Sequence, residues 1–171
     1  ILKAFYAARY GKTEKEQSFR EFAANMLKRI PDDTVINKII HEFRYNEEGR
    51  RDQAGKCMVF LADSFADPLL NILKESQHRS ERARILQVVS DMGAAAVPFL
   101  TQKIQEGKPW YFMRNLVLLF GKTGNESHID ILRPFLSHDD YRVQREALNS
   151  IYNIGGKQRE EIFLSVLPDA S

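Results

Sequence analysis

Histidine and acidic residues lie close together at two places in this 171-residue sequence. His128 and Asp130 are two residues apart, and His138 is followed directly by Asp139 and Asp140. Such side chains bind metals or transfer protons when they converge. Residues two apart point to different sides of a helix, and aspartates before a helix commonly cap its first turn. We therefore expect no metal site and no catalytic residue here, and a helix capped by Asp139 or Asp140.

Cys57 is the only cysteine, so an internal disulfide is impossible and a reducing compartment fits. Because Met58 beside it belongs to an apolar series, we expect Cys57 to be buried as a small hydrophobic residue. No phosphate-binding loop, serine-hydrolase motif or zinc-protease motif occurs in the sequence. These observations predict a protein that is not an enzyme and that needs no cofactor.

The strongest candidate for partner binding is an aromatic pair beside polar residues at an expected helix start. Trp110 and Tyr111 precede Arg114 and Asn115, and Arg145 follows Arg114 by 31 residues. Tryptophan, tyrosine and arginine are enriched at binding hot spots. Two alternatives are structural: Trp110 covers a junction between repeats, and the periodic arginines pair with acidic groups or carbonyls of a neighbouring repeat. The spacing favours the structural role for the arginines.

These residues belong to a sequence that repeats. Gly93, Gly124 and Gly155 are spaced 31 residues apart. The apolar residues keep the same spacing before each glycine (Leu86, Val117, Leu148; Val89, Phe120, Ile151) and after it (Leu69, Leu100, Ile131, Ile162; Leu73, Ile104, Phe135, Val166). Periodic self-similarity of this kind predicts an array of stacked units. We expect an all-α protein of about five antiparallel helix pairs, with no strand.

Three positions modify this expectation. The stretch 46–52 is the most polar connection and is predicted to be a loop. Gly55 occupies the position of Leu86 one repeat earlier, so its unit should be packed less fully. Pro134 lies inside an expected helix over 126–137 and should kink it or remove a hydrogen bond.

The segment Asp139–Leu148, continuing to Ile154 and Gly155, resembles the first helix of a HEAT repeat, with its aspartate, Val-Arg-type pair, Ala-Leu and terminal Ile-Gly. Met113–Gly124 is similar, with Thr123 in place of the isoleucine. The short period is similar to that of bacterial HEAT-like repeats, including those of phycobilisome lyases. The resemblance implies an armadillo-like, right-handed α-α superhelix, with first helices on the convex face and second helices on the concave face. It is clear over 51–171 and degenerate over 1–50.

Charge distinguishes two classes of function. The net charge of +2 is small, and the expected second helices carry a slight excess of acidic residues, whereas a phosphate-binding surface should be basic. We therefore expect a protein-binding scaffold or regulatory module rather than a nucleic-acid binder like the HEAT-like DNA glycosylases. Handling of a tetrapyrrole, as in lyases, is a third alternative without a specific residue to support it.

The last predictions concern the two ends of the sequence and the cellular location of the protein. The sequence begins Ile-Leu-Lys without a methionine, and we interpret residues 1–171 as a single solenoid cut from a longer protein. Apolar ends at Leu2–Tyr6 and Phe163–Leu167 would favour self-association. The longest apolar runs, such as Leu116–Phe120, are far shorter than the roughly 20 residues that span a bilayer. We expect a cytoplasmic protein without a membrane partner.

Overall fold

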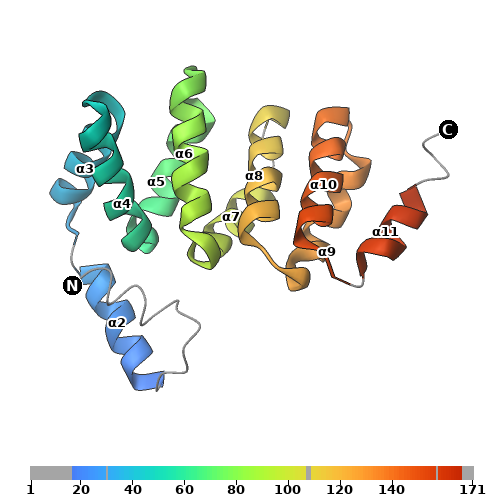
Figure 1. Cartoon of the computed structure of the whole chain (residues 1–171), viewed down its shortest axis with the longest axis horizontal. Coiled ribbons are helices and arrows are strands. Elements are labelled where there is room, and N and C mark those ends of the chain that lie inside the picture. Colours follow the sequence, from blue (N-terminus) through green and yellow to red (C-terminus); the bar gives the residue numbers. More distant parts are fainter. Residues whose placement is uncertain (1–16, 30, 107–108, 157, 167–171) are drawn as a thin grey trace. The chain divides into compact units, whose positions relative to one another are not determined.

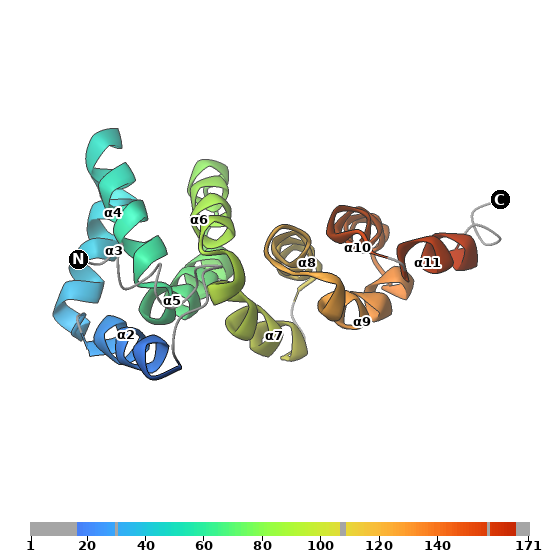
Figure 2. The same ribbon diagram turned by 60° about the horizontal axis from the view of Figure 1, so that its bottom comes forward.

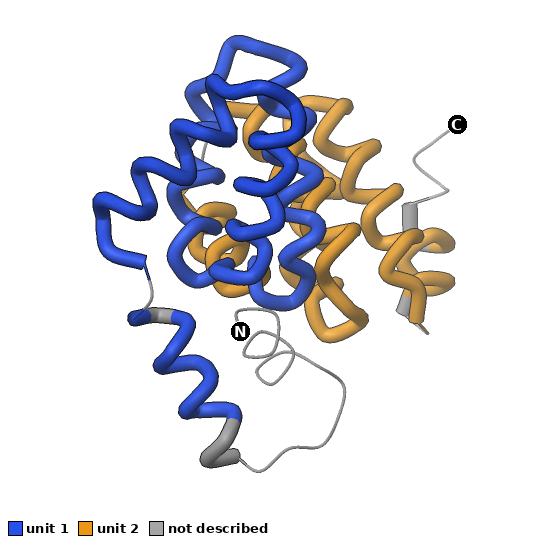
Figure 3. Tube along the Cα trace, turned by 60° about the vertical axis from the view of Figure 1, so that its left-hand side comes forward, with its two compact units in different colours: residues 1–96 blue, residues 97–171 orange. Residues whose placement is uncertain are grey.

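The structure of the chain, a computed structural model, describes residues 17–29, 31–106, 109–156 and 158–166. These residues are helical and contain no strand, as predicted. The helix expected over 1–10 and the apolar end Leu2–Tyr6 lie outside the described residues. Two compact units divide the chain, residues 1–96 and residues 97–171 (Figure 3), and each is considered by itself.

Most helices of unit 1 pack against their neighbours in the sequence (Figure 1). Its elements are α2 (Gln17–Arg29), α3 (Asp33–Tyr45), α4 (Glu48–Phe60), α5 (Ala62–Glu75), α6 (Arg79–Asp91) and the 3₁₀ turn η1 (Gly93–Ala96). The helix α4 contacts α3, α5 and α6, so it lies at the centre of this unit. The side chains between these helices form a continuous apolar core that includes Phe43, Met58, Phe65, Leu69 and Ile85.

The prediction of a loop over 46–52 is wrong. Helix α4 begins at Glu48, and only Asn46 and Glu47 separate it from α3. Asn46 ends α3 by donating its backbone N–H to the carbonyl of Glu42. The polar residues that follow are largely exposed on the first turns of α4. Polarity marked an exposed helix start rather than a break, because a helix needs apolar residues only on its packed face.

Unit 2 contains two long helices that lie side by side. Its elements are α7 (Val97–Gln105), α8 (Trp110–Thr123), η2 (Glu126–His128), α9 (Ile129–Leu132), η3 (Arg133–Ser137), α10 (Tyr141–Ile154) and α11 (Gln158–Val166). Helices α8 and α10 make the most extensive contact between any two elements described. Figure 2 views both nearly along their axes, with α9 to one side of them.

The expected helix over 126–137 is broken into three short pieces, which confirms the disruption predicted from Pro134. Asn125 caps the first piece, since its side chain accepts from the backbone N–H of Ser127. Pro134 falls within the 3₁₀ turn η3. The breaks shift the buried positions, so Ile129 and Leu132 are fully buried, whereas the predicted Ile131 and Phe135 are only half-buried.

The core follows the repeat, with one correction to the phase. Val89, Phe120 and Ile151 are fully buried, as predicted. In the second predicted series only Val117 is buried, and Leu86 and Leu148 are half-buried. The residues that directly precede this series in the chain, Ile85, Leu116 and Ala147, are all fully buried. Both buried series lie on the packed face of the first helix of each pair.

The recurring glycines serve two different turns. Gly93 and Gly155 follow α6 and α10 with φ of 58° and 76°, a conformation that favours glycine. Gly124 has φ of −77°, and a Cβ there would lie 2.7 Å from the carbonyl oxygen of Phe120.

Within the described residues, no single helix has both the length and the apolar character needed to cross a bilayer. The segments Arg79–Asp91 and Gly93–Gln105 pass that test only when they are counted together.

Candidate functional site

Two of the predicted site residues, Trp110 and Arg114, lie at the contact between α8 and α10. The guanidinium carbon of Arg142, on α10, lies 3.3 Å from the centre of the Trp110 ring, at the start of α8. Trp110 is half-buried in this position. Stacking of a guanidinium on an indole face combines cation–π attraction with dispersion. Trp110 therefore covers the junction between two successive helix pairs, the structural alternative that the sequence left open.

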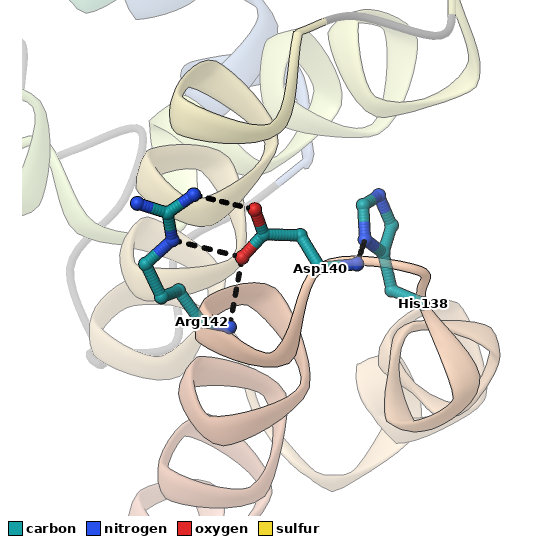
Figure 4. Close-up of polar contacts among 3 residues, drawn as sticks. All are labelled: His138, Asp140 and Arg142. Carbon is teal, nitrogen blue, oxygen red and sulfur yellow. Dashed lines mark hydrogen bonds and ion pairs between the residues drawn. The ribbon is translucent and has the colours of Figure 1, made fainter.

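Asp140 fixes the guanidinium that covers Trp110 (Figure 4). Its carboxylate accepts from Arg142 Nε at 3.0 Å and from Nη2 at 2.7 Å, and it also accepts from the Arg142 backbone N–H at 2.9 Å. This last bond makes Asp140 the N-cap of α10, as predicted for Asp139 or Asp140. Hydrogen bonds from Arg142 lower the pKa of Asp140 from 3.8 to about 2, and the bonded carboxylate raises the pKa of Arg142.

The histidines have local structural partners. His138 Nδ1 accepts from the Asp140 backbone N–H at 3.0 Å (Figure 4), and His128 Nδ1 accepts from the Asn125 backbone N–H at 3.1 Å. Among the described residues, no group of three or more His, Cys, Asp or Glu side chains converges to hold a metal. The expectation that Cys57 is buried is wrong, because its side chain is half-buried.

Arg114 pairs across the same contact as Trp110. Its Nε lies 3.6 Å from a carboxylate oxygen of Glu146 on α10. This Nε is buried, and no hydrogen-bond partner for it occurs among the described residues, so the interaction is an ion pair only. Arg114 therefore has the kind of acidic partner that the spacing favoured for the periodic arginines, whereas Arg145 is exposed.

Close approach of the two backbones completes the contact. The Ser150 hydroxyl, on α10, donates to the carbonyl oxygen of Val117 on α8 at 2.9 Å. A Cβ added to Gly121 would lie 2.7 Å from the Ser150 Cα. Glycine at this position therefore allows α10 to reach α8.

The remaining predicted residues do not lie in one patch. Asn115 is buried, whereas Tyr111 is 42% exposed and meets Trp110 edge to face, with ring centres 6.1 Å apart. Arg145 lies on α10 and is exposed. The contact between α8 and α10 thus uses Trp110 and Arg114 and leaves Tyr111 and Arg145 facing solvent.

Arg145 belongs to an exposed surface that the sequence reasoning missed. Tyr141, Arg145, Asn149 and Tyr152 recur on one side of α10, and all four are exposed. We call this the α10 surface. Tyr141 is 68% exposed, and its ring is the counterpart of Trp110 one repeat later. The 31-residue shift that relates Arg114 to Arg145 also relates Trp110 to Tyr141, and this signal could have identified the surface.

The end of the α10 surface contacts α11. The Tyr152 ring lies edge to face with Phe163, and the guanidinium carbon of Arg159 lies 5.1 Å from the Tyr152 ring centre. Within the predicted apolar end Phe163–Leu167, Phe163 is half-buried and Leu164 is strongly exposed. Self-association through this end stays a prediction.

A second polar cluster lies in unit 1 around Glu81. This carboxylate is buried, accepting from Arg44 Nε at 2.7 Å and from the Ser76 hydroxyl at 2.5 Å. Burial alone would raise the pKa of Glu81, but the bonds from Ser76 and Arg44 and the charges of Arg44 and Arg84 outweigh it, so the pKa is lowered. A buried carboxylate with a lowered pKa stays ionised at neutral pH, which suits an ion pair and not a general acid.

Comparisons with known proteins add no assignment: no family model matches the sequence, and a search of curated proteins finds no significant similarity.

Proposed function

We propose that this chain is a non-catalytic protein-binding module, built as a HEAT-like superhelix of helix pairs. The 31-residue spacing of the buried residues Val89, Phe120 and Ile151 supports the repeat architecture. The shifted pKa values of Glu81, Asp140 and Arg142 all have partners within the fold. Glu81 joins α6 to Arg44 of α3, and the Asp140–Arg142 pair caps α10. These charges thus have structural roles, which supports binding in place of catalysis.

The observation that carries the proposal is the exposure of Tyr141 and Arg145. One repeat earlier, Trp110 is covered by Arg142 and Arg114 is paired with Glu146. The same two positions on α10 are exposed. Tyrosine and arginine at the centre of an interface are typical binding hot spots. We infer that a further protein segment packs on the α10 surface, either from a partner protein or from another helix pair of a longer chain.

The partner approaches α10 differently from the way in which α10 approaches α8. The position of Gly121 on α8 corresponds to Tyr152 on α10, and the Tyr152 ring is held by Phe163 and Arg159. A backbone cannot come as close to a tyrosine as Ser150 comes to Gly121. We infer that the partner contributes side chains that fit between Tyr141 and Tyr152. A cytoplasmic location is part of this proposal, since a lone cysteine suits a reducing compartment.

Affinity capture with matched variants tests the proposal. The wild type is compared with Tyr141→Ala/Arg145→Ala and with Lys122→Ala, a control at an exposed residue of α8. We expect one protein to be captured by the wild type and the control and to be lost with the double variant. Equal capture by all three forms, or capture of nucleic acid, would overturn the proposal.

A further inference from the structure

An apolar groove lies in unit 1 between α4 and α6, remote in sequence from the α10 surface. Its volume is about 330 Å³. The residues that line it recur about once per turn on each helix: Arg51, Gly55 and Val59 on α4, and Arg84, Val88 and Asp91 on α6. The buried ring of Phe43, on α3, also lines it. Eight residues of helix span about 12 Å, so the groove follows α4 for two turns.

One residue of the lining is a glycine at a repeated apolar position. Gly55 occupies the position that Leu86 has one repeat later, and the unit was expected to be packed less fully. A Cβ at Gly55 would lie 3.3 Å from Val88 Cγ2 and 3.7 Å from the Phe43 ring. Glycine at residue 55 therefore lets Val88 and Phe43 lie close to α4, and all three residues line the groove.

Two of the residues that line the groove are arginines, each with a donor that makes no hydrogen bond among the described residues. The Nε atoms of Arg51 and Arg84 are buried, and neither has a hydrogen-bond partner among the described residues. The Arg84 guanidinium carbon lies 6.0 Å from the centre of the Phe43 ring. A buried N–H without an acceptor is unfavourable, and an arginine binds a carboxylate best through its fork of donors. Both side chains are therefore suited to an incoming carboxylate.

The acidic residues nearby do not fulfil this role. Asp91 accepts from Gln87 Nε2 at 2.8 Å, and Asp52 is exposed at the rim. Glu81 attracts Arg84, but its two oxygens accept from Arg44 and Ser76. Lys56 adds a third positive charge to the lining.

We propose that this groove binds an acidic peptide segment of a partner protein, with one large apolar side chain against Phe43, Val59 and Val88 and an Asp or Glu side chain on Arg51 and Arg84. Filling of an interhelical groove by an apolar anchor, with charged groups at its edge, is a common mode of peptide recognition. The site is in unit 1 and does not depend on the α10 surface.

A peptide fits these features better than a small fatty acid does. The cavity volume is at the low end for ligand pockets, which suits one large side chain. The arginines stand on both helices, and the lining extends for two turns, so a chain lying along the groove can reach both.

Fluorescence anisotropy with synthetic peptides tests the proposal. The probes are labelled helical peptides that carry one Phe, Leu or Trp with Glu residues one turn away, and the same peptides with Gln for Glu. Dodecanoate serves as a competitor. The protein variants are Arg51→Met and Arg84→Met, which remove donors while keeping much of the side-chain length, and Val59→Phe, which fills the groove. Arg50→Met is the matched control, because Arg50 is exposed next to Arg51 and its ion pair is with Glu42. Circular dichroism checks that each variant is folded.

We expect the Glu peptides to bind, with affinity reduced about tenfold by Arg51→Met and by Arg84→Met. Val59→Phe should also weaken binding, whereas Arg50→Met should leave it unchanged. The Gln peptides should bind more weakly than the Glu peptides. Absence of binding by every peptide, equal binding of Gln and Glu peptides, displacement by dodecanoate at concentrations below those of the peptides, or an equal effect of Arg50→Met would each overturn the proposal.

Discussion

Arg142 stacks on Trp110 with its guanidinium carbon 3.3 Å from the ring centre, while Asp140 binds the same guanidinium through two hydrogen bonds. One arginine thus joins the N-cap of α10 to the first residue of α8. The contact links consecutive repeats at the ends of their first helices. Because Trp110 is the only tryptophan in the chain, its fluorescence reports on this contact alone.

Replacement of Arg142 by alanine should uncover Trp110. We expect emission at longer wavelength and stronger quenching by acrylamide, since the indole loses its guanidinium cover and meets water. The far-ultraviolet circular dichroism should change little, because α8 and α10 keep their apolar contact. Arg145→Ala, an exposed arginine on the same helix, is the control and should leave the emission unchanged. An identical spectrum for Arg142→Ala and wild type would contradict the stacked arrangement.

Replacement of Trp110 by alanine should lower the free energy of unfolding by about 1 to 3 kcal/mol, because a half-buried aromatic ring and its cation–π contact are both lost. Urea denaturation followed by circular dichroism measures the change. Tyr111→Ala is the neighbouring control, and its greater exposure predicts a smaller loss. A larger loss for Tyr111 than for Trp110 would show that the two rings have been assigned the wrong roles.

Acid should selectively weaken the cap of α10. The pKa of Asp140 is about 2 in the folded protein, below its ordinary value of 3.8. The ionised carboxylate therefore stabilises the fold above pH 3.8, and this contribution is lost as the pH falls towards 2. Asp140→Asn keeps a capping oxygen but removes the charge. We expect its stability deficit relative to wild type to be constant near neutral pH and to shrink below pH 3.8. A deficit that does not depend on pH would exclude the ion pair as its cause.

Gly121→Ala should separate α8 from α10. The added methyl carbon would lie 2.6 Å from the Ser150 hydroxyl oxygen and 2.7 Å from the Ser150 Cα, so the backbone of α10 must move. We expect a loss of about 1 to 3 kcal/mol in the free energy of unfolding.

Gly49→Ala is the matched control for Gly121→Ala. Gly49 lies in α4, and no atom would lie within 4 Å of its added Cβ. Alanine there should stabilise the fold by up to about 1 kcal/mol, since it favours the helix. Thermal unfolding of both variants measures the contrast, and destabilisation by both would show that packing at residue 121 is not the reason.

The periodic sequence predicted the structural features that recur in each repeat. It did not predict the features that depend on contacts between particular side chains of different helices. The all-helical class, the buried series at Val89 and the break at Pro134 follow from periodicity and proline chemistry. The α4–α6 groove was not anticipated, because Gly55 at a repeated apolar position predicted only looser packing, and Val88 and Phe43 lie close to it. The arginine donors in it were not anticipated, because their lack of acceptors depends on where side chains of other helices end.

The start of α4 shows a different limit. The segment 46–52 has the composition of a loop, yet most of it is the exposed first turns of a helix. Local composition cannot separate these states, because the apolar residues that fix α4 against the core, Ala54 and Met58, follow this segment. The role of Trp110 was undecided for a similar reason: only the position of Arg142 on the neighbouring helix gives the ring its cover.

Glu81 offers the clearest test of how a buried charge is tolerated in unit 1. It occupies the register in which the later repeats have Phe112 and Val143, both buried. Arg44→Met would leave the carboxylate buried with the Ser76 hydroxyl as its remaining close donor, and we expect a loss of about 1 to 3 kcal/mol in the free energy of unfolding. This loss should be smaller at acidic pH, where protonation of Glu81 removes the buried charge.

The double variant Arg44→Met/Glu81→Leu separates the charge from the packing. It places an apolar residue in the register of Phe112 and Val143 and removes both charges. Replacement of a buried ion pair by apolar residues is often neutral or stabilising. We therefore expect the double variant to regain most of the stability that Arg44→Met loses, measured by urea denaturation at neutral pH. If the double variant is less stable than the single one, the cluster of Arg44, Ser76 and Glu81 contributes net stability to the contact between α3 and α6.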